Sequence, residues 1–441
     1  MGLHGIFDKK GSIVPGLCGI LGYPMKTLLA RALEARLPAA LRFLRELVEI
    51  NSYTLNREGV NANAARVVWQ FSRLGFEEKF IPCEVENAGN HLILDSGGEG
   101  PVIACVSHLD TVFTAQEEIS QNFQWRQEGS LVYGPGTYDI KGGTALLWMM
   151  LDALAEVDPD TFRRFRWVLL WNAAEEVLTP DFAQIAFSLL PRETRCALVF
   201  EGDNGSAAGR FGVLRGRKGM ARFRVRVSGR GAHAGGSHQN GASAIHQLAR
   251  TVNELEALTD YQREATVNVG YVTGGSVLNR VPHEAEAALE MRAYDPAVFR
   301  ELCDRITGLQ GEGAVRAVSD GYPTTVAIDP LGEIPPWSGG PETERLVEVW
   351  EAAGAEAGHP LEAGRRGGLS DGNYLAERFP VLDALGPQGG NAHASEYEPQ
   401  KGKLPEFIDT ASLVPKALIN LLALQALAKE APRMDKTAPI S

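Results

Sequence analysis

Residues 167–177 read Trp-Val-Leu-Leu-Trp-Asn-Ala-Ala-Glu-Glu-Val, an apolar run that leads directly into two adjacent carboxylates. Neighbouring side chains point to opposite faces of a strand, and on a helix they diverge by about 100°. Glu175 and Glu176 can therefore do different work, one holding a cation while the other handles a proton. The alternative interpretation is a Glu-Glu pair on a solvated helix. The ends of the other apolar runs decide between the two.

Short apolar runs of this kind alternate with helical patterns through the first half of the chain. We expect strands at 92–94, 102–106, 168–170 and 197–200. We expect helices at 28–50, 61–74 and 143–154, with Gly75 as the C-terminal cap of the second. Strands that are apolar on both faces and separated by helices indicate an α/β domain with a largely parallel sheet.

The pattern changes near Gly216. Residues 222–227 alternate arginine with apolar side chains, which predicts a strand with one dry face and one wet face. Two further alternating strands at 266–272 and 284–293 and a helix at 242–258 complete a small α+β domain with an open antiparallel sheet. We interpret this domain as an insertion.

The α/β pattern resumes with a helix at 343–357, a strand at 381–383 and a helix at 411–428. The expected organisation is an α/β domain with a mostly parallel sheet, interrupted by an inserted α+β domain. The expected limits are 26–215 and 320–430 for the α/β domain, 216–319 for the inserted domain, and 1–25 for a poorly ordered extension.

Composition narrows the class of protein. A chain of 441 residues is too long for one ordinary core, so two domains are expected. The net charge of -12 argues against nucleic acid and anionic membrane as partners, and no uninterrupted apolar run approaches the roughly 20 residues that span a bilayer. The five scattered cysteines include no C-x-x-C pair, which argues against a thiolate zinc site and predicts a cytoplasmic protein. Met25 is a second possible start of the chain. A short leader is a separate alternative, and it would make the protein secreted or periplasmic.

Histidines and carboxylates follow the predicted strands. His108 and Asp110 come after the strand at 102–106, Glu201 follows the strand at 197–200, and His393 lies beyond the strand at 381–383. Sites in open α/β sheets form beyond the carboxyl ends of the strands. Clustered carboxylates repel one another unless cations neutralise them, and imidazole with carboxylate oxygen suits zinc, cobalt or manganese. The pattern predicts a metal centre.

Each of these residues also has a purely structural interpretation. His108 could be a hydrogen-bonded histidine at a strand end, and Glu201 a capping or ion-paired carboxylate. Asp139, in the Gly-rich loop 134–143, could simply cap the helix that opens there. The positions favour the metal centre, because independent structural roles would not all fall at strand ends of one sheet.

Three motifs together resemble a known family. They are His-Leu-Asp-Thr-Val at 108–112, Gly-Pro-Gly-Thr-Tyr-Asp-Ile-Lys-Gly-Gly at 134–143, and the Glu-Glu pair. In this order they resemble the dinuclear zinc aminoacylase/carboxypeptidase superfamily, over about residues 44–422. That group includes glutamate carboxypeptidase, acetylornithine deacetylase and succinyl-diaminopimelate desuccinylase, and it carries an inserted lid domain.

The resemblance implies two Zn²⁺ ions, for which Co²⁺ or Mn²⁺ could substitute, and it implies which residues bind each ion. Asp139 would bridge the two metals. Glu176 and His393 would complete one site, and His108 and Glu201 the other.

The same resemblance makes Asp110 the residue that orients the His108 imidazole, and Glu175 the general base. Two cations lower the pKa of a bridging water from 15.7 toward about 7. A carboxylate within hydrogen-bond reach can then accept the proton and pass it to the leaving amine.

In the lid, the resemblance implies substrate contacts. His233, in Gly-Ala-His-Ala-Gly, would stabilise the tetrahedral oxyanion, often across a homodimer formed by the lid. Asn279 and Arg292 would hold the substrate carboxylate, which suits the planar fork of arginine. Arg210 is a candidate for a second carboxylate contact, with a solvated surface arginine as the alternative. The loop 367–372 resembles a family loop that lines the pocket.

The expected reaction is hydrolysis of an amide beside a free carboxylate, in a dipeptide or an N-acyl amino acid. A glutamate-carboxypeptidase-like exopeptidase is the first expectation, N-acyl amino acid deacylation the second, and a non-catalytic binding relative the third. The chain departs from the family at Ala173-Ala174, where an acidic residue is usual, and at Leu178-Thr179-Pro180, which replaces a Gly-Ser turn. Both departures affect the shape of the pocket.

Overall fold

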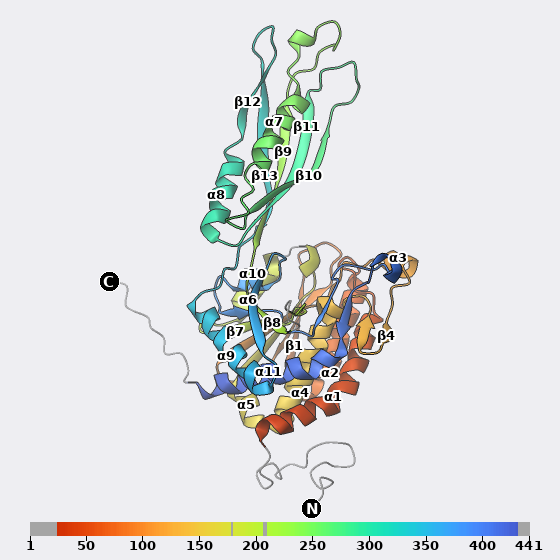
Figure 1. Cartoon of the computed structure of the whole chain (residues 1–441), viewed down its shortest axis with the longest axis vertical. Helices are drawn as coiled ribbons and strands as arrows, with labels where there is room; N and C mark the ends of the chain where they lie inside the picture. Colours follow the sequence, from red (N-terminus) through yellow and green to blue (C-terminus); the bar gives the residue numbers. More distant parts are fainter. Residues whose placement is uncertain (1–23, 178–179, 206–209, 431–441) are drawn as a thin grey trace, which may run out of the picture. The chain divides into compact units, whose positions relative to one another are not determined.

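The computed structural model describes residues 24–177, 180–205 and 210–430 and divides the chain into two compact units (Figure 1). The first unit comprises the chain up to Arg215, residues 339–364 and the chain from Ser370 onward. The second unit comprises residues 216–338 and 365–369. The Leu178-Thr179 departure from the family pattern lies outside the described residues.

A six-stranded sheet forms the centre of the first unit. Its strands run in the order β1 (Glu77–Pro82), β2 (Asn90–Asp95), β6 (Arg166–Asn172), β3 (Val102–His108), β7 (Cys196–Val199) and β15 (Val381–Leu382). The four strands from β6 to β15 pair in parallel, whereas β1 and β2 add to the edge antiparallel. The parallel strands β3 and β7 are buried along their whole length, which explains why they read as unbroken apolar runs.

Helices of the first unit pack with this sheet into one core. The long helices are α1 (Met25–Val48), α2 (Arg57–Phe71), α4 (Gly142–Val157), α9 (Pro341–Ala357) and α11 (Leu413–Lys429). Helix α1 continues through Pro38. By length and composition alone, Thr410–Lys429 is apolar enough to cross a membrane, but 67% of that window is buried inside the structure. Its apolar side chains belong to the core.

Shorter elements complete the first unit. The helices are α3 (Ala115–Ser120), α5 (Pro159–Arg164), α6 (Pro180–Leu189) and α10 (Gly372–Leu375). A small antiparallel sheet contains β4 (Arg126–Glu128), β5 (Leu131–Tyr133), β16 (Gly389–Gly390) and β17 (Phe407–Asp409). A separate pair is formed by β8 (Phe211–Arg217) and β14 (Leu361–Arg366), both of which run to the boundary with the second unit.

The second unit is built on an antiparallel five-stranded sheet. Its order is β10 (Thr266–Gly274), β11 (Glu284–Ala293), β9 (Gly219–Ser228), β13 (Pro323–Ile334) and β12 (Gly311–Arg316). Helices α7 (Ala244–Glu256) and α8 (Pro296–Thr307) contribute to the core on its dry face. On the wet face, the arginines of β9 pair with carboxylates of the strands beside it.

The inserted unit ends later than the sequence pattern suggested. Strand β13 pairs with β9, so the structure places the end of this unit at Ser338 rather than at Ser319. The register of β13 shifts between Pro330 and Gly332. These two residues interrupt the alternation that would otherwise have marked the strand, because proline lacks an N–H and glycine has no side chain to pack.

One close approach connects α4 to the strand end that carries Glu201. A Cβ on Gly143 would lie 1.9 Å from the carbonyl oxygen of Phe200. We expect Gly143→Ala to force α4 away from β7 and to destabilise the protein by about 1–3 kcal/mol, as overpacking does. The measurement is Tm. In the control Gly364→Ala the new methyl meets nothing nearer than 3.8 Å, and equal Tm values for the two variants would contradict the prediction.

Candidate metal centre

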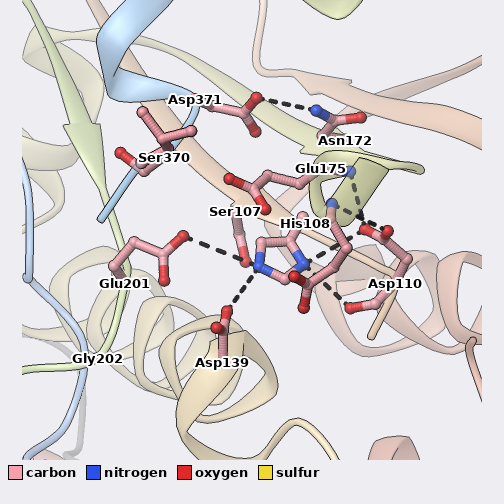
Figure 2. A network of polar contacts seen from close by, with 12 residues as sticks. Ser107, His108, Asp110, Asp139, Asn172, Glu175, Glu201, Gly202, Ser370 and Asp371 are labelled. Atoms are coloured by element: carbon pink, nitrogen blue, oxygen red, sulfur yellow. Dashed lines mark hydrogen bonds and ion pairs between the residues drawn. The ribbon is translucent and has the colours of Figure 1, made fainter. Parts of the chain in front are cut away.

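His108, the last residue of β3, is held with one ring nitrogen toward a cluster of carboxylates (Figure 2). Its Nδ1 lies 3.0 Å from the backbone carbonyl oxygen of Asp110. Because a carbonyl only accepts, Nδ1 carries the proton and donates it. Nε2 then faces Asp139 Oδ1 at 2.9 Å and Glu201 Oε1 at 3.8 Å. A histidine that donates one N–H and presents its other nitrogen to carboxylates is arranged as a metal ligand.

Asp139 lies between two histidines. Its Oδ2 is 3.3 Å from Nε2 of His393, and that same nitrogen is 3.1 Å from Glu176 Oε2. Two groups of possible ligands therefore share Asp139. His108, Asp139 and Glu201 form one, Asp139, Glu176 and His393 form the other, and the ligand atoms within each group lie within 4.8 Å of one another. The five residues named as metal ligands from sequence thus meet in space, and their oxygen and imidazole atoms fit zinc, cobalt or manganese.

The protonation of this cluster shows how it balances charge. Burial raises the pKa of Asp139, but the hydrogen bonds from His108 and His393 outweigh burial and lower that pKa below its ordinary value. Hydrogen bonds to Asp139 and Glu176 raise the pKa of His393 to about 11. Burial, reinforced by Asp139, raises the pKa of Glu176 to about 7. Without a cation, the imidazole protons offset the carboxylate charge, and bound cations would take over that role.

The Glu-Glu pair begins a short 3₁₀ turn after β6. The side chain of Glu176 is only 6% exposed, which rules out the solvated-helix interpretation. The backbone N–H groups of Glu175 and Glu176 donate to Asp110 Oδ1 and Oδ2 at 3.1 and 3.3 Å. The preceding amide, that of Ala174, donates to Asn172 Oδ1 at 3.0 Å. Side chains, rather than a neighbouring strand, thus fix the backbone of this turn.

Asp110 contacts the His108 ring and also fixes the Glu-Glu turn. Its carboxylate oxygen is 3.4 Å from His108 Nδ1, and its backbone carbonyl oxygen is 3.0 Å from the same nitrogen. The carboxylate also accepts the two amides of the Glu-Glu turn and a 2.7 Å hydrogen bond from the Thr54 hydroxyl. One residue therefore contacts both the His108 ring and the turn that carries Glu175.

Burial raises the pKa of Glu175 well above its ordinary value; Glu176 and Asp371 raise it further and His108 opposes them. Asp371, a residue of the 367–372 loop for which no individual role was predicted, accepts a 2.8 Å hydrogen bond from Asn172. Figure 2 shows Glu175 between Asp371 and the His108 ring. A raised pKa makes a carboxylate a stronger proton acceptor, which suits a general base.

Glu406 is a further residue that sequence reasoning missed. This buried carboxylate accepts the amides of Tyr138 and Asp139 at 2.8 and 3.1 Å, and its own amide donates to the Ala394 carbonyl at 2.8 Å. One residue therefore ties the loop of Asp139 to the turn of His393. Burial raises the pKa of Glu406 to about 8. The sequence around it is a polar loop, where no periodicity marks a buried residue.

The expected oxyanion residue lies in the second unit. His233 is exposed, and its Nδ1 accepts the amides of Gly235 and Gly236 at 3.2 and 2.9 Å. Its proton is therefore on Nε2, which leaves an N–H that can donate. The adjacent Ala234 amide donates to the backbone carbonyl of Asn279, so the His233 and Asn279 segments lie side by side.

Two arginines were named as carboxylate contacts. Arg292 lies in the second unit, where its guanidinium donates to Glu290 Oε1 at 2.6 Å and to the Gly367 carbonyl at 2.8 Å. This places it against the 367–372 loop singled out from sequence. Arg210 lies in the first unit at an exposed position, and its carbonyl accepts from Gln388.

Comparisons with known proteins relate this chain to peptidases. The family model of the peptidase dimerisation domain matches residues 215–315. Carboxypeptidase G2 of Pseudomonas sp. (strain RS-16) is 26% identical over 365 residues, which cover 82% of this chain and 84% of that protein.

Solved structures share the fold. An aminopeptidase from Bacillus cereus has a TM-score of 0.67 at 19% identity, over 89% of this chain and 99% of that one. A metallo-carboxypeptidase from Sulfolobus solfataricus has a TM-score of 0.64 at 16% identity, over 88% of this chain and 99% of that one. At these identities the likeness establishes the fold alone.

The two groups of ligands predict that cations stabilise the folded chain. We expect ZnCl₂ to raise the Tm of chelator-treated protein, because an ion that binds only the native state adds about 2.7 kcal/mol at 100 times its Kd. Asp139→Asn should lose most of this shift, since both groups share Asp139. Identical melting curves with zinc and with chelator would contradict the assignment.

Proposed function

Because the chain belongs to the zinc aminoacylase/carboxypeptidase superfamily of hydrolases, we propose that it cleaves an amide bond beside a free carboxylate, as a glutamate-carboxypeptidase-like exopeptidase. The observation that carries this proposal is the pair of ligand groups sharing Asp139, with the partly buried Glu175 next to them. The extent of the similarity to carboxypeptidase G2, over most of both chains, supports it.

His108 and Glu201, with Asp139, would hold one Zn²⁺, and Glu176 and His393, with Asp139, would hold the other; Co²⁺ or Mn²⁺ could substitute. When bound, such cations polarise the scissile carbonyl and acidify a coordinated water. Asp139 suits the shared position because its two oxygens already face different histidines.

Glu175 is the general base of the proposed reaction. Its carboxylate takes a proton from the attacking water and delivers it to the nitrogen of the leaving amine as the amide bond breaks. The two amides bound by Asp110 prevent the turn from shifting, so the Glu175 side chain starts from a fixed backbone. Fixed placement of this kind lowers the entropy that the reaction must lose.

The second unit supplies the remaining contacts. The Nε2–H of His233 donates to the oxyanion of the tetrahedral intermediate, and Asn279 and Arg292 hold the substrate carboxylate. Arg292 suits this role because Glu290 and Gly367 hold its guanidinium in place. Arg210 is assigned a second contact to the carboxylate. The match to the peptidase dimerisation domain supports a homodimer formed through this unit.

A panel of substrates distinguishes exopeptidase from deacylase activity. We expect zinc-loaded protein to hydrolyse dipeptides with a C-terminal acidic residue faster than N-acetyl amino acids. Faster hydrolysis of the N-acyl compounds would favour the deacylase alternative, to which the Ala173-Ala174 departure is relevant because it adjoins Glu175. Hydrolysis of neither class would favour a non-catalytic relative, although every proposed ligand and the base are present in the chain.

Glu175→Gln and Glu176→Gln should separate the two adjacent glutamates. We expect Glu175→Gln to lower kcat by about 10²–10⁴-fold, the usual contribution of a general base, with its zinc content intact. Glu176→Gln should instead lose one zinc ion per chain. Metal analysis and steady-state kinetics measure the two effects, and full turnover by Glu175→Gln would remove this residue from the mechanism.

His233→Ala tests the oxyanion contact. Removing one such donor typically lowers kcat by about 10²–10³-fold, and the zinc content should stay at the wild-type value because His233 belongs to neither ligand group. Zinc analysis together with steady-state kinetics checks this, and loss of metal from the variant would contradict the role of His233 as an oxyanion contact.

A further inference from the structure

Cys83, His91 and Asp181 form another group whose composition suggests a metal site. Their possible ligand atoms lie within 4.8 Å of one another, and His91 and Asp181 are buried. None of the three belongs to the two groups that share Asp139. The hydrogen bonds of His91 show what the group of Cys83, His91 and Asp181 does.

The proton of His91 is placed by a backbone amide. The Ala173 N–H donates to His91 Nδ1 at 3.1 Å, and a backbone amide can only donate. Nδ1 therefore holds the lone pair, and Nε2 carries the proton, which it donates to Asp181 Oδ2 at 3.0 Å. A metal-ligating histidine, such as His108 here, donates through the nitrogen that does not face the metal. His91 has the opposite arrangement, so the group is a chain of hydrogen bonds.

Further contacts hold both His91 and Asp181 in place. The side chain of His91 is fully buried, and its ring packs on Phe182 with 5.5 Å between centroids. Asp181 Oδ2 also accepts the Glu84 amide at 2.8 Å. The hydrogen bonds thus connect the amide of Glu84, in the loop after β1, through Asp181 at the start of α6 and through His91 to the amide of Ala173. No other element that we describe supplies an acceptor to that amide.

Ala173 is the first of four consecutive residues whose amides donate to side chains. The next three amides donate to Asn172 and Asp110, and the last two of the four residues are Glu175 and Glu176. We propose that His91, its tautomer set by Asp181, is a positioning residue that holds this segment so that Glu175 and Glu176 reach the metal centre. The effect on catalysis rests on the proposed function, whereas the effect on the tautomer and on cation binding does not.

Asp181→Leu removes the acceptor of the His91 proton. Oδ2 of Asp181 accepts both the His91 Nε2–H and the Glu84 amide, so its loss leaves a buried N–H without an acceptor, and we expect the ring to lose the orientation that places Nδ1 against the Ala173 N–H. Asp181→Asn is the conservative variant, because an amide oxygen in the place of Oδ2 would keep both bonds. His91→Phe removes the acceptor and keeps an aromatic ring against Phe182.

The ¹⁵N shifts of the imidazole nitrogens report the tautomer directly in cation-free protein, with His91→Phe identifying the resonance. We expect Nε2–H in the wild type and in Asp181→Asn. Calorimetric Zn²⁺ titration should show one of the two binding steps weakened about 10–100-fold in Asp181→Leu and His91→Phe, as is typical when the partner of a functional side chain is lost, and unchanged in Asp181→Asn. In Asp181→Leu and His91→Phe we expect a fall in kcat of similar size with KM little changed.

Trp350→Phe is the matched control. Trp350 is fully buried between α9 and α11 and donates from Nε1 to Asn420 Oδ1 at 2.9 Å. Loss of this hydrogen bond should lower Tm, as the loss of any buried hydrogen bond does, while kcat and the affinities of both Zn²⁺ binding steps stay at wild-type values.

An Nδ1–H tautomer in the wild type, or Asp181→Leu and His91→Phe variants that lose only Tm as the control does, would overturn the proposal. If His91→Phe fails to fold, Asp181→Leu compared with Asp181→Asn decides between these outcomes. If wild-type protein hydrolyses no amide, the proposed function fails, but the tautomer and the zinc titration still decide the role of His91.

Discussion

The site depends on how four successive amides, those of residues 173–176, are satisfied where strand β6 ends. A buried amide without an acceptor is costly, and beyond Asn172 no neighbouring strand in the described part of the chain supplies one. The acceptors are the side chains of His91, Asn172 and Asp110. The backbone that carries both glutamates is therefore shaped by residues from β2, β6 and the end of β3, and an error in any of them would move the proposed base and a proposed ligand together.

Charge is the second constraint. Asp139, Glu176 and Glu201 cluster around His108 and His393. His108, Glu176 and Glu201 lie at or just beyond the carboxyl ends of the parallel strands β3, β6 and β7, whereas Asp139 precedes α4 and His393 follows β16 of the small antiparallel sheet. Such a group is stable only with compensating positive charge, which the histidines supply by holding protons and which cations would supply in their place. Glu406 then makes the arrangement rigid, because it joins the loop of Asp139 to the turn of His393.

Much of this could be predicted because strands buried on both faces read as apolar runs and parallel strands meet at one edge. The same reasoning missed β1, whose residues are mostly exposed, and β13, whose alternation is broken at Pro330 and Gly332. It also missed Glu406, since a buried carboxylate in a polar loop has no periodic signal. Its burial depends on amides of Tyr138 and Asp139, more than 260 residues away in sequence.

The sequence by itself determined the chemistry available at the site, because the identity of a side chain sets which atoms can bind a metal or carry a proton. It also determined which residues would come near one another, since strand ends converge. Only the tertiary structure decided what each histidine does with that chemistry. His108 presents Nε2 to carboxylates because its Nδ1–H donates to a backbone carbonyl. His91 instead accepts the Ala173 amide at Nδ1, and its Nε2–H donates to Asp181. The direction of a hydrogen bond is set by the group at its other end, and for His91 both partners lie more than 80 residues away along the chain.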